Sequence, residues 1–208
     1  MSRKVYVSLG SNKGSEFLAL QKSKIYSEDF VIYAFEPEER CFKHIEKVQE
    51  QVPNITHIKA CAGTYDGIVS FNVGKNTLSG SVRKDKKRGL TNDTIDMESI
   101  DICKWLNDNI NEDDYVILTM DIEGSEYDIL PIMLKNKCSD LINKIYIEFH
   151  GKKMKEDVSE LEKSLKENLH EKWGTNFFDR YVEGNMGLFG KVYEDLDPNM
   201  FNNIGDLN

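Results

Sequence analysis

Acidic residues and a histidine follow two apolar segments in the second half of the chain. Asp121 and Glu123 come directly after one apolar run, and Glu148 and His150 close another. Residues two apart share a face of an extended chain, so each pair is expected to point to one side. Paired carboxylates at a strand end can bind a hard cation or act as a base, and a histidine there can take a proton near neutral pH. A satisfied polar pair at a strand end explains Glu148 and His150 equally well.

A glycine-rich turn follows the first apolar run of the chain, residues 5–9. Gly10 and Gly14 allow positive φ and let a ligand approach the backbone closely. The spacing is neither G-x-G-x-x-G nor G-x-x-x-x-G-K-[ST], so the two common nucleotide-phosphate loops are disfavoured. A tight turn without a ligand is the alternative interpretation.

Two more strand ends carry candidate binding residues. Glu36 follows the apolar run 30–35, and an acidic residue at the end of a second strand can accept hydrogen bonds from both hydroxyls of a ribose. A solvated carboxylate at a helix start is the alternative for Glu36. Small residues at 60–63, including Cys61 and Ala62, leave room for a flat ring, although a simple strand-to-turn transition has the same composition.

The segments that must position these residues alternate between strand-like and helix-like patterns. This alternation predicts an α/β domain with a doubly wound, mostly parallel sheet, which binds ligands outside the carboxyl ends of its strands. The length fits a single domain, predicted over 1–195 with a loosely held tail at 196–208. Strands are predicted at 5–9, 30–35, 55–61, 115–120 and 144–150, and helices around 17–21, 42–48, 100–106, 125–134 and 158–169.

The middle of the chain departs from this alternation. Asp66-Gly67, before the alternating segment 68–73, predicts a hairpin-type excursion. From 74 to 94 the chain is polar and rich in Gly, Ser, Lys and Arg, which indicates a long, mobile surface loop able to contact a substrate. Two aromatic-rich segments, 177–182 and 188–193, predict a C-terminal antiparallel strand pair.

The composition is that of an acidic protein with a substantial core. The 208 residues include 27 basic and 36 acidic side chains, a net charge of −9, and 39% are hydrophobic. The negative charge disfavours a broad nucleic-acid surface. No apolar run approaches the roughly 18–20 residues of a membrane span, and the N-terminal run is too short for a signal peptide. Together with four widely separated cysteines, this favours a cytoplasmic protein with reduced thiols.

The strand-end motifs occur in the order seen in FkbM-type methyltransferases, and the chain resembles that family over roughly residues 5–150. The D-I-E-G-S-E and F-E-P motifs are the more specific ones, whereas the glycine loop is shared by many methyltransferases. The resemblance implies a Rossmann-like fold of the class I methyltransferase type, S-adenosylmethionine as cofactor, and O-methyl transfer, commonly to a sugar hydroxyl or a polyketide-type product. The matching segments are 10–14, 35–37, 60–63, 66–67, 96–106, 121–126 and 148–150.

The resemblance also implies roles for individual residues. The proton of the acceptor hydroxyl would pass to Asp121 or His150, and Asp121 and Glu123 would hold Mg²⁺ if the route is metal-assisted. Both routes stay open at this point. The cofactor would be held at its methionine part by Gly10, Asn12 and Gly14, at its ribose by Glu36, and at its adenine by Cys61 and Ala62.

One position departs from the family pattern. The family usually has an acidic residue where Ser8 stands, and in related enzymes that carboxylate helps to hold the amino-acid end of the cofactor. Ser8 can accept a hydrogen bond but carries no charge. We therefore expect either a weaker hold on the cofactor or a contact supplied by another residue.

Two other functions remain compatible with the sequence. A degenerate cofactor-binding or scaffolding protein would explain Ser8, and an RNA ribose methyltransferase would use the basic run 83–88, which a solvated loop face also explains. The acceptor is expected to contact the 74–94 loop and the loops after Asp121 and His150. The apolar pair 177–178 leaves a homodimer open.

Overall fold

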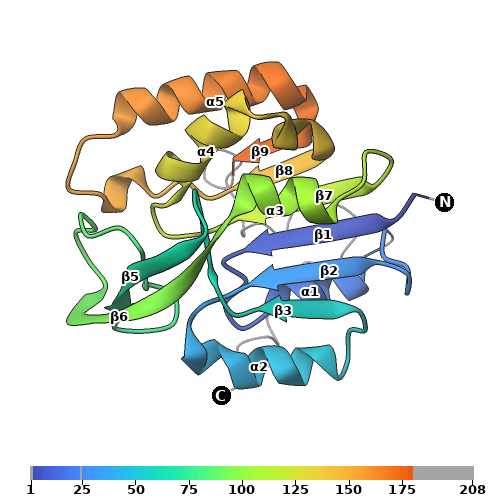
Figure 1. Ribbon diagram of the computed structural model, residues 1–208, viewed down its shortest axis with the longest axis horizontal. Coiled ribbons are helices and arrows are strands. Elements are labelled where there is room, and N and C mark those ends of the chain that lie inside the picture. The colour runs from blue at the N-terminus through green and yellow to red at the C-terminus, as the bar shows by residue number, and fades with distance from the viewer. Residues whose placement is uncertain (1, 24, 180–208) are drawn as a thin grey trace.

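A six-stranded sheet forms the centre of the protein. The computed structural model describes residues 2–23 and 25–179 (Figure 1). All neighbouring strands run parallel, in the order β3-β2-β1-β7-β8-β9. The order reverses direction at β1, which is the arrangement of a doubly wound fold and confirms the predicted class. The strands are β1 (Lys4–Leu9), β2 (Val31–Phe35), β3 (Ile55–Ile58), β7 (Tyr115–Met120), β8 (Lys144–Ile147) and β9 (Phe177–Asp179).

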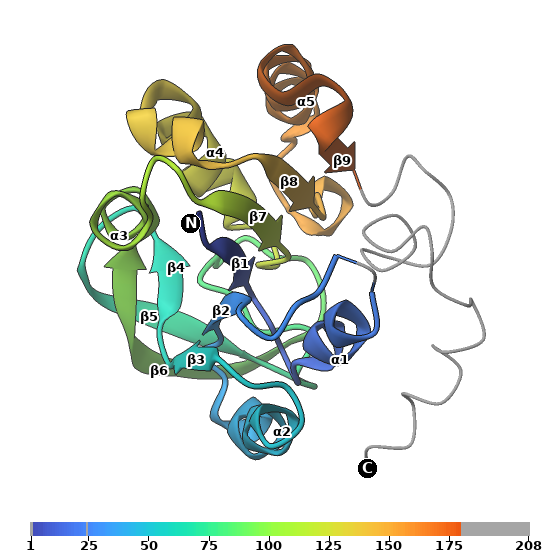
Figure 2. The same cartoon turned by 90° about the vertical axis from the view of Figure 1, so that its right-hand side faces the viewer.

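Helices cover both faces of this sheet, as Figure 2 shows edge-on. Alternate residues of β1 divide between two cores: Tyr6 packs with the α1 and α2 side, and Val5 and Val7 pack with the α3, α4 and α5 side. Burial on both faces explains the continuously apolar strands. No helix among the described residues has the length and apolar character needed to cross a membrane. The helices are α1 (Ser15–Gln21), α2 (Glu39–Gln49), α3 (Ile102–Asn109), α4 (Glu126–Lys135) and α5 (Ser159–Trp173), with short 3₁₀ turns η1 (Lys137–Leu141), η2 (Gly151–Lys153) and η3 (Gly174–Asn176).

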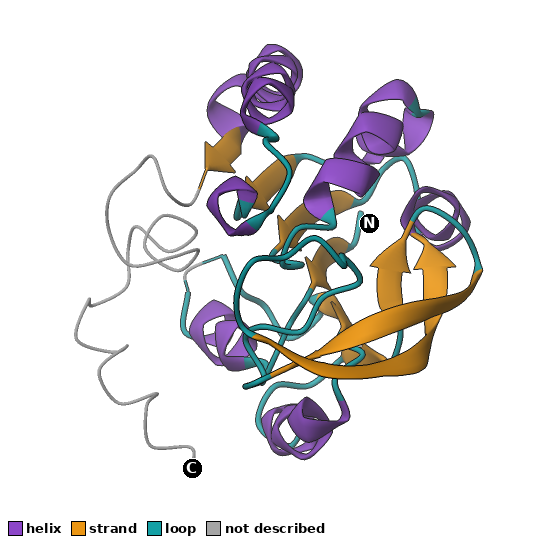
Figure 3. Ribbon diagram, turned by 90° about the vertical axis from the view of Figure 1, so that its left-hand side faces the viewer, coloured by secondary structure: helices purple, strands orange, loops and turns teal. Residues whose placement is uncertain are grey.

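A smaller sheet lies beyond the carboxyl ends of the main strands (Figures 1 and 3). It has the order β4-β6-β5, with β5 (Gly67–Gly74) antiparallel and β4 (Cys61–Gly63) parallel to β6 (Leu90–Asp101). The predicted strand 55–61 is therefore divided between two sheets. Figure 3 shows the long β5–β6 ribbon and the loop that joins its strands.

The predicted loop 74–94 was too long, because its last residues belong to β6 and only 75–89 connect the two strands. Half of the β6 residues are exposed and only Ser99 is buried, so the strand carries no apolar alternation that would reveal it. The following helix begins at Ile102 rather than at Ile100, because Asp101 caps it by accepting hydrogen bonds from the N–H groups of Cys103 and Lys104.

The last residues that the structure describes form an edge strand of the six-stranded sheet. Phe177–Asp179 forms β9, parallel to β8, at the start of the predicted strand 177–182. Its predicted antiparallel partner at 188–193 and the tail at 196–208 lie outside the described residues.

Candidate active site

The carboxyl ends of β1, β2 and β7 meet through backbone hydrogen bonds. The N–H groups of Gly10 and Ser11 donate to the carbonyl oxygen of Phe35, at 3.0 and 3.1 Å, and the N–H of Asp121 donates to the carbonyl of Leu9 at 2.9 Å. Gly10 has φ 87°, and a Cβ atom there would lie 2.0 Å from the carbonyl oxygen of Asp121. Glycine is therefore required where the first loop passes the fourth main strand.

Two adjoining pockets, of about 90 and 260 Å³, open at this edge. Both are lined by Gly10, Asn12 and Asp121 and by residues 77–78 of the 75–89 loop, so they form one cleft. The cleft brings together most of the residues that were predicted as a site. The first pocket adds Glu36, Cys61, Ala62 and Glu123, and the second adds Ser8.

Gly14 lies outside the lining of both pockets. It has φ 74°, donates its N–H to the carbonyl of Ser11 at 2.8 Å, and stands immediately before α1. Its position shapes the turn that presents Gly10 and Asn12, rather than the surface of the cleft.

Glu36 is held rigidly at the rim of the first pocket. Its two carboxylate oxygens accept hydrogen bonds from the N–H groups of Asn12, at 2.7 Å, and Glu38, at 2.8 Å. Only 6% of the residue is exposed. Burial raises the pKa of Glu36 to about 7, although the two backbone hydrogen bonds oppose that rise. Each oxygen retains a second lone pair, so the carboxylate can still accept hydrogen bonds from a ligand.

Cys61 and Ala62 form an apolar part of the same pocket. Both are buried at the start of the small sheet. Burial raises the pKa of the Cys61 thiol to about 12, so the thiol is neutral at physiological pH. Neutral, small side chains leave this wall suited to an uncharged flat ring.

A buried carboxylate lies against Ser8 that sequence reasoning did not identify. Glu16, in the first turn of α1, accepts hydrogen bonds from the hydroxyl of Ser8 and, at 3.0 Å, from that of Tyr6. The hydroxyl of Thr119 lies 3.5 Å from the same carboxylate. Glu16 lines the second pocket, so an acidic group is present beside Ser8. No motif links residues 8 and 16; only the packing of α1 against β1 brings them together.

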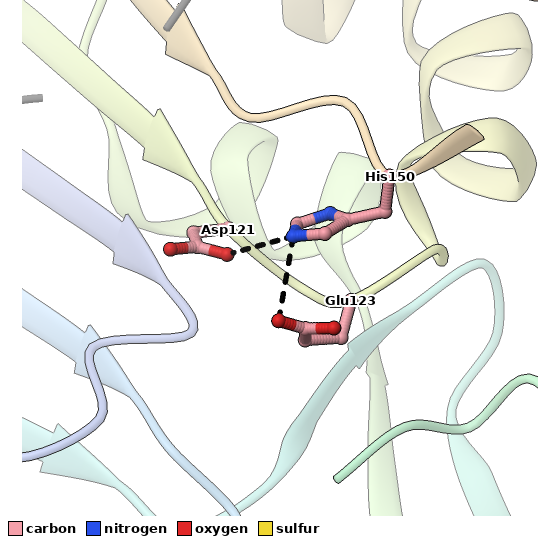
Figure 4. A group of neighbouring side chains, drawn as sticks. All are labelled: Asp121, Glu123 and His150. Carbon is pink, nitrogen blue, oxygen red and sulfur yellow. Dashed lines mark ion pairs between the residues drawn. The ribbon is translucent and has the colours of Figure 1, made fainter. Parts of the chain in front are cut away.

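Four carboxylates surround His150 (Figure 4 shows two of them). The Nε2 atom lies 3.4 Å from Asp121 Oδ1, 3.4 Å from Glu123 Oε1 and 3.3 Å from Glu148 Oε1. On the other side of the ring, Nδ1 lies 3.0 Å from Glu126 Oε1, which also accepts the backbone N–H of His150 at 2.8 Å. Burial disfavours a charge on His150, but the neighbouring carboxylates of Glu123 and Glu126 outweigh it and raise the pKa to about 10.

Two lysines reach Glu123 from separate loops. Lys86 Nζ lies 2.6 Å from Glu123 Oε2, and Lys153 Nζ lies 2.8 Å from Oε1. Burial tends to raise the pKa of Glu123, yet His150 and the two lysines lower it to about 2, so the group is ionised. Glu123 adopts φ 55°, an uncommon conformation for a non-glycine residue, and its carbonyl accepts a hydrogen bond from Ser81 at 2.8 Å.

The basic run 83–88 is only partly the solvated loop face that the sequence suggested. Lys86 is only 4% exposed, and Arg83 pairs with Asp85 at 2.8 Å and with Asp128 at 2.9 Å. Its inward members therefore fasten the 75–89 loop to the site, a role that the spacing of charges along the sequence does not reveal.

His150 and the carboxylates around it differ in side-chain exposure; together they are called the His150 cluster. The side chain of Asp121 is 34% exposed, compared with 13% for Glu123, 11% for Glu148 and none for His150. Asp121 also lines both pockets. A molecule in the cleft therefore meets Asp121 first, with His150 behind it.

Comparisons with known proteins agree with this architecture. A crystal structure of methyltransferase FkbM from Methylobacillus flagellatus KT superposes with a TM-score of 0.50 at 18% sequence identity, which concerns the fold alone. The superposition covers 80% of this chain but 37% of that one, so the present chain spans little more than a third of its length. None of the curated proteins matches the sequence. The methyltransferase FkbM domain matches residues 8–173, most of the chain, and the protein therefore belongs to the FkbM methyltransferase family.

Proposed function

We propose that this methyltransferase uses S-adenosylmethionine to methylate a hydroxyl group of a sugar or glycan. The observation that carries the proposal is the convergence of Gly10, Glu36 and Asp121 on one cleft. Such a reaction needs a carboxylate that binds the ribose, an apolar wall for the adenine ring and an accessible carboxylate that takes a proton.

The residues present fit the cofactor. Glu36 retains lone pairs for the ribose hydroxyls, and the wall of Cys61 and Ala62 suits adenine. Glu16 lines the pocket next to Ser8 and supplies a carboxylate for the ammonium group of the methionine part. Glu16 would thereby replace the carboxylate that the family usually has at position 8.

Bound S-adenosylmethionine would supply a methyl group on a positively charged sulfur, and neutral S-adenosylhomocysteine would leave as the acceptor oxygen takes that methyl group. Asp121 orients the acceptor hydroxyl and takes its proton, because Asp121 is the member of the cluster exposed to the cleft. His150 acts behind Asp121 as a positioning residue. Positioning two reactants in this way can lower a barrier by roughly 7–11 kcal/mol.

The cofactor half of the proposal is tested by calorimetry with S-adenosylhomocysteine, the product form of the cofactor. Glu36→Gln is expected to weaken binding at least about tenfold, because hydrogen bonds to a charged group contribute roughly 1.5–3 kcal/mol. Glu39→Gln makes the same change at the neighbouring exposed position on α2 and should bind as the unaltered protein does. Equal affinity in both variants would contradict ribose binding by Glu36.

The acceptor half is tested with a labelled methyl donor and a panel of free sugars, glycans and nucleotides. Product on sugar hydroxyls, lost in Asp121→Asn while S-adenosylhomocysteine still binds, is the expected result. Binding without transfer to any acceptor would favour the scaffolding function instead, and transfer to nucleotides alone would favour the RNA ribose methyltransferase.

A further inference from the structure

We propose that Asp121, Glu123 and His150 form a binding site for a single divalent transition-metal ion of the Mn²⁺ type. One oxygen from each carboxylate and one ring nitrogen lie within 4.8 Å of one another. The inference extends the proposed function, because the same aspartate faces the acceptor cleft, but it concerns metal binding and can be tested separately.

The distances around Nε2 are the first argument. A protonated ring nitrogen that donates to a carboxylate normally lies about 2.7–2.9 Å from one oxygen. Here the oxygens of Asp121, Glu123 and Glu148 lie at 3.3–3.4 Å, and Nε2, in a residue only 1% exposed, has no hydrogen-bond partner among the described residues. An ion with metal–ligand distances of about 2.1 Å holds adjacent ligands roughly 3 Å apart, so an inward movement would bring these atoms onto a shared ion. The ion would take the place of the proton on Nε2, which is released to solvent.

The opposite side of the ring is the second argument. Glu126 is fully buried, and its Oε1 receives both Nδ1 and the backbone N–H of His150, while its Oε2 accepts the N–H of Gly124 at 2.9 Å. A carboxylate bonded to one ring nitrogen orients the other nitrogen toward a metal in many metalloproteins. The sequence alone suggested only a possible Mg²⁺ site at Asp121 and Glu123. Adding an imidazole shifts the preference away from Mg²⁺, which favours oxygen ligands, toward a divalent first-row transition metal, and two carboxylates favour Mn²⁺ within that series.

The remaining carboxylate oxygen of Asp121 explains how an ion and a proton acceptor can coexist. In Figure 4, one oxygen of Asp121 faces His150 and the other points away from it. With the first oxygen on the ion, the second is left to take the proton of an acceptor hydroxyl. Lys153, whose side chain is 38% exposed, can move away from Glu123 Oε1 when an ion binds.

The test is a titration of the full chain, freed of metals with EDTA, with Mn²⁺ followed by electron paramagnetic resonance. The unaltered protein should bind one equivalent, and Asp121→Asn should bind at least about tenfold more weakly. Asp108→Asn, the same change at an exposed position on α3, should bind as the unaltered protein does. His150→Gln should lose binding as well, and Asp121→Asn keeps the test decisive if that variant fails to fold, because the side chain of Asp121 is partly exposed.

Several results would overturn the inference. The metal site would be contradicted if the protein bound no Mn²⁺ at millimolar concentration, or if Asp121→Asn bound Mn²⁺ as tightly as the unaltered protein. Displacement of Mn²⁺ by an equal concentration of Mg²⁺ would contradict the preference for Mn²⁺. S-adenosylhomocysteine binding in EDTA separates this inference from the proposed function. Cofactor binding without Mn²⁺ binding removes the metal site alone, and Mn²⁺ binding without cofactor binding removes the proposed cofactor alone.

Discussion

The two halves of the cleft are built by different forces. On the β1–β2 side, the loop after Leu9 and the carboxylate of Glu36 are held by hydrogen bonds to backbone N–H and carbonyl groups. On the β7–β8 side, Glu123 and His150 are held by charged side chains, including Lys86 from a distant loop. The first half is fixed by chain geometry, and the second depends on a balance of charges that the surrounding loops complete.

This difference teaches where each half is vulnerable. A backbone-held loop fails when a side chain is added where none fits. A charge cluster fails when one partner is removed, because the remaining buried charges then lack compensation. The following changes test that contrast.

The largest effect is expected for Gly10→Ala. The new Cβ atom would lie 2.0 Å from the carbonyl oxygen of Asp121, and φ 87° is strained for alanine. We expect the free energy of unfolding to fall by at least about 3 kcal/mol, measured by denaturant titration. Gly174→Ala is the control, because it also has a positive φ, 54°, but its Cβ would meet nothing within 4 Å. The control should lose less, about 1–2 kcal/mol, because it has the backbone strain without the clash, and equal losses in the two variants would show that the contact with Asp121 is unimportant.

A smaller effect is expected from the ionisation of Glu36. Burial raises its pKa from 4.5 to about 7, so the folded protein holds this proton more tightly than the unfolded chain does. The stability that Glu36 contributes is therefore full below pH 4.5 and is lost as the pH rises to about 7. The unfolding free energy of the unaltered protein relative to Glu36→Gln should fall by about 3 kcal/mol across that window.

The control for this measurement is Glu39→Gln, which lies on the exposed face of α2. The pH-dependent fall is expected for Glu36→Gln alone, because only that substitution removes a buried carboxylate. If the difference in unfolding free energy between Glu36→Gln and the unaltered protein does not change with pH either, folding does not raise the pKa of Glu36.

The smallest effect is expected for Lys86→Met, which tests the charged half. The substitution removes the ion pair with Glu123 and the hydrogen bond from Nζ to the carbonyl of Ser79, at 2.7 Å, while the alkyl chain is largely kept. We expect amide hydrogens in 75–89 to exchange about tenfold faster, measured by mass spectrometry, because the loop opens more often. Lys84→Met, at an exposed position of the same loop, should leave exchange unchanged. Unaltered exchange in both variants would show that Lys86 does not fasten the loop.

Much of the main sheet could be predicted from the sequence, because strands buried on both faces are continuously apolar. The runs that became β1, β2 and β7 stand out for that reason. No part of β6 was predicted as a strand, because a largely exposed strand of a small sheet has no such pattern. The division of 55–63 between β3 and β4 was also missed, since two short strands joined directly have the composition of one.

The candidate site was predictable where it consists of residues at strand ends. Glu36 and Asp121 follow their strands directly, and the parallel order brings those ends together. Glu16 and Lys86 were not predictable in this way. Their places depend on how α1 and the 75–89 loop pack, and a single acidic or basic residue in such segments is ordinarily exposed.

The pairing of β4 with β6 has a consequence for how such enzymes diversify. Gly63 and Asp101 are register partners, so the chain departs from the core and returns to it at adjacent points. A segment of different length or sequence can therefore replace 64–100 without stretching the main sheet, provided that this pairing, the cap on α3 and a cation against Glu123 are kept. One wall of the cleft can thus be exchanged between Gly63 and Asp101, while the glycine turn and Glu36 stay unchanged.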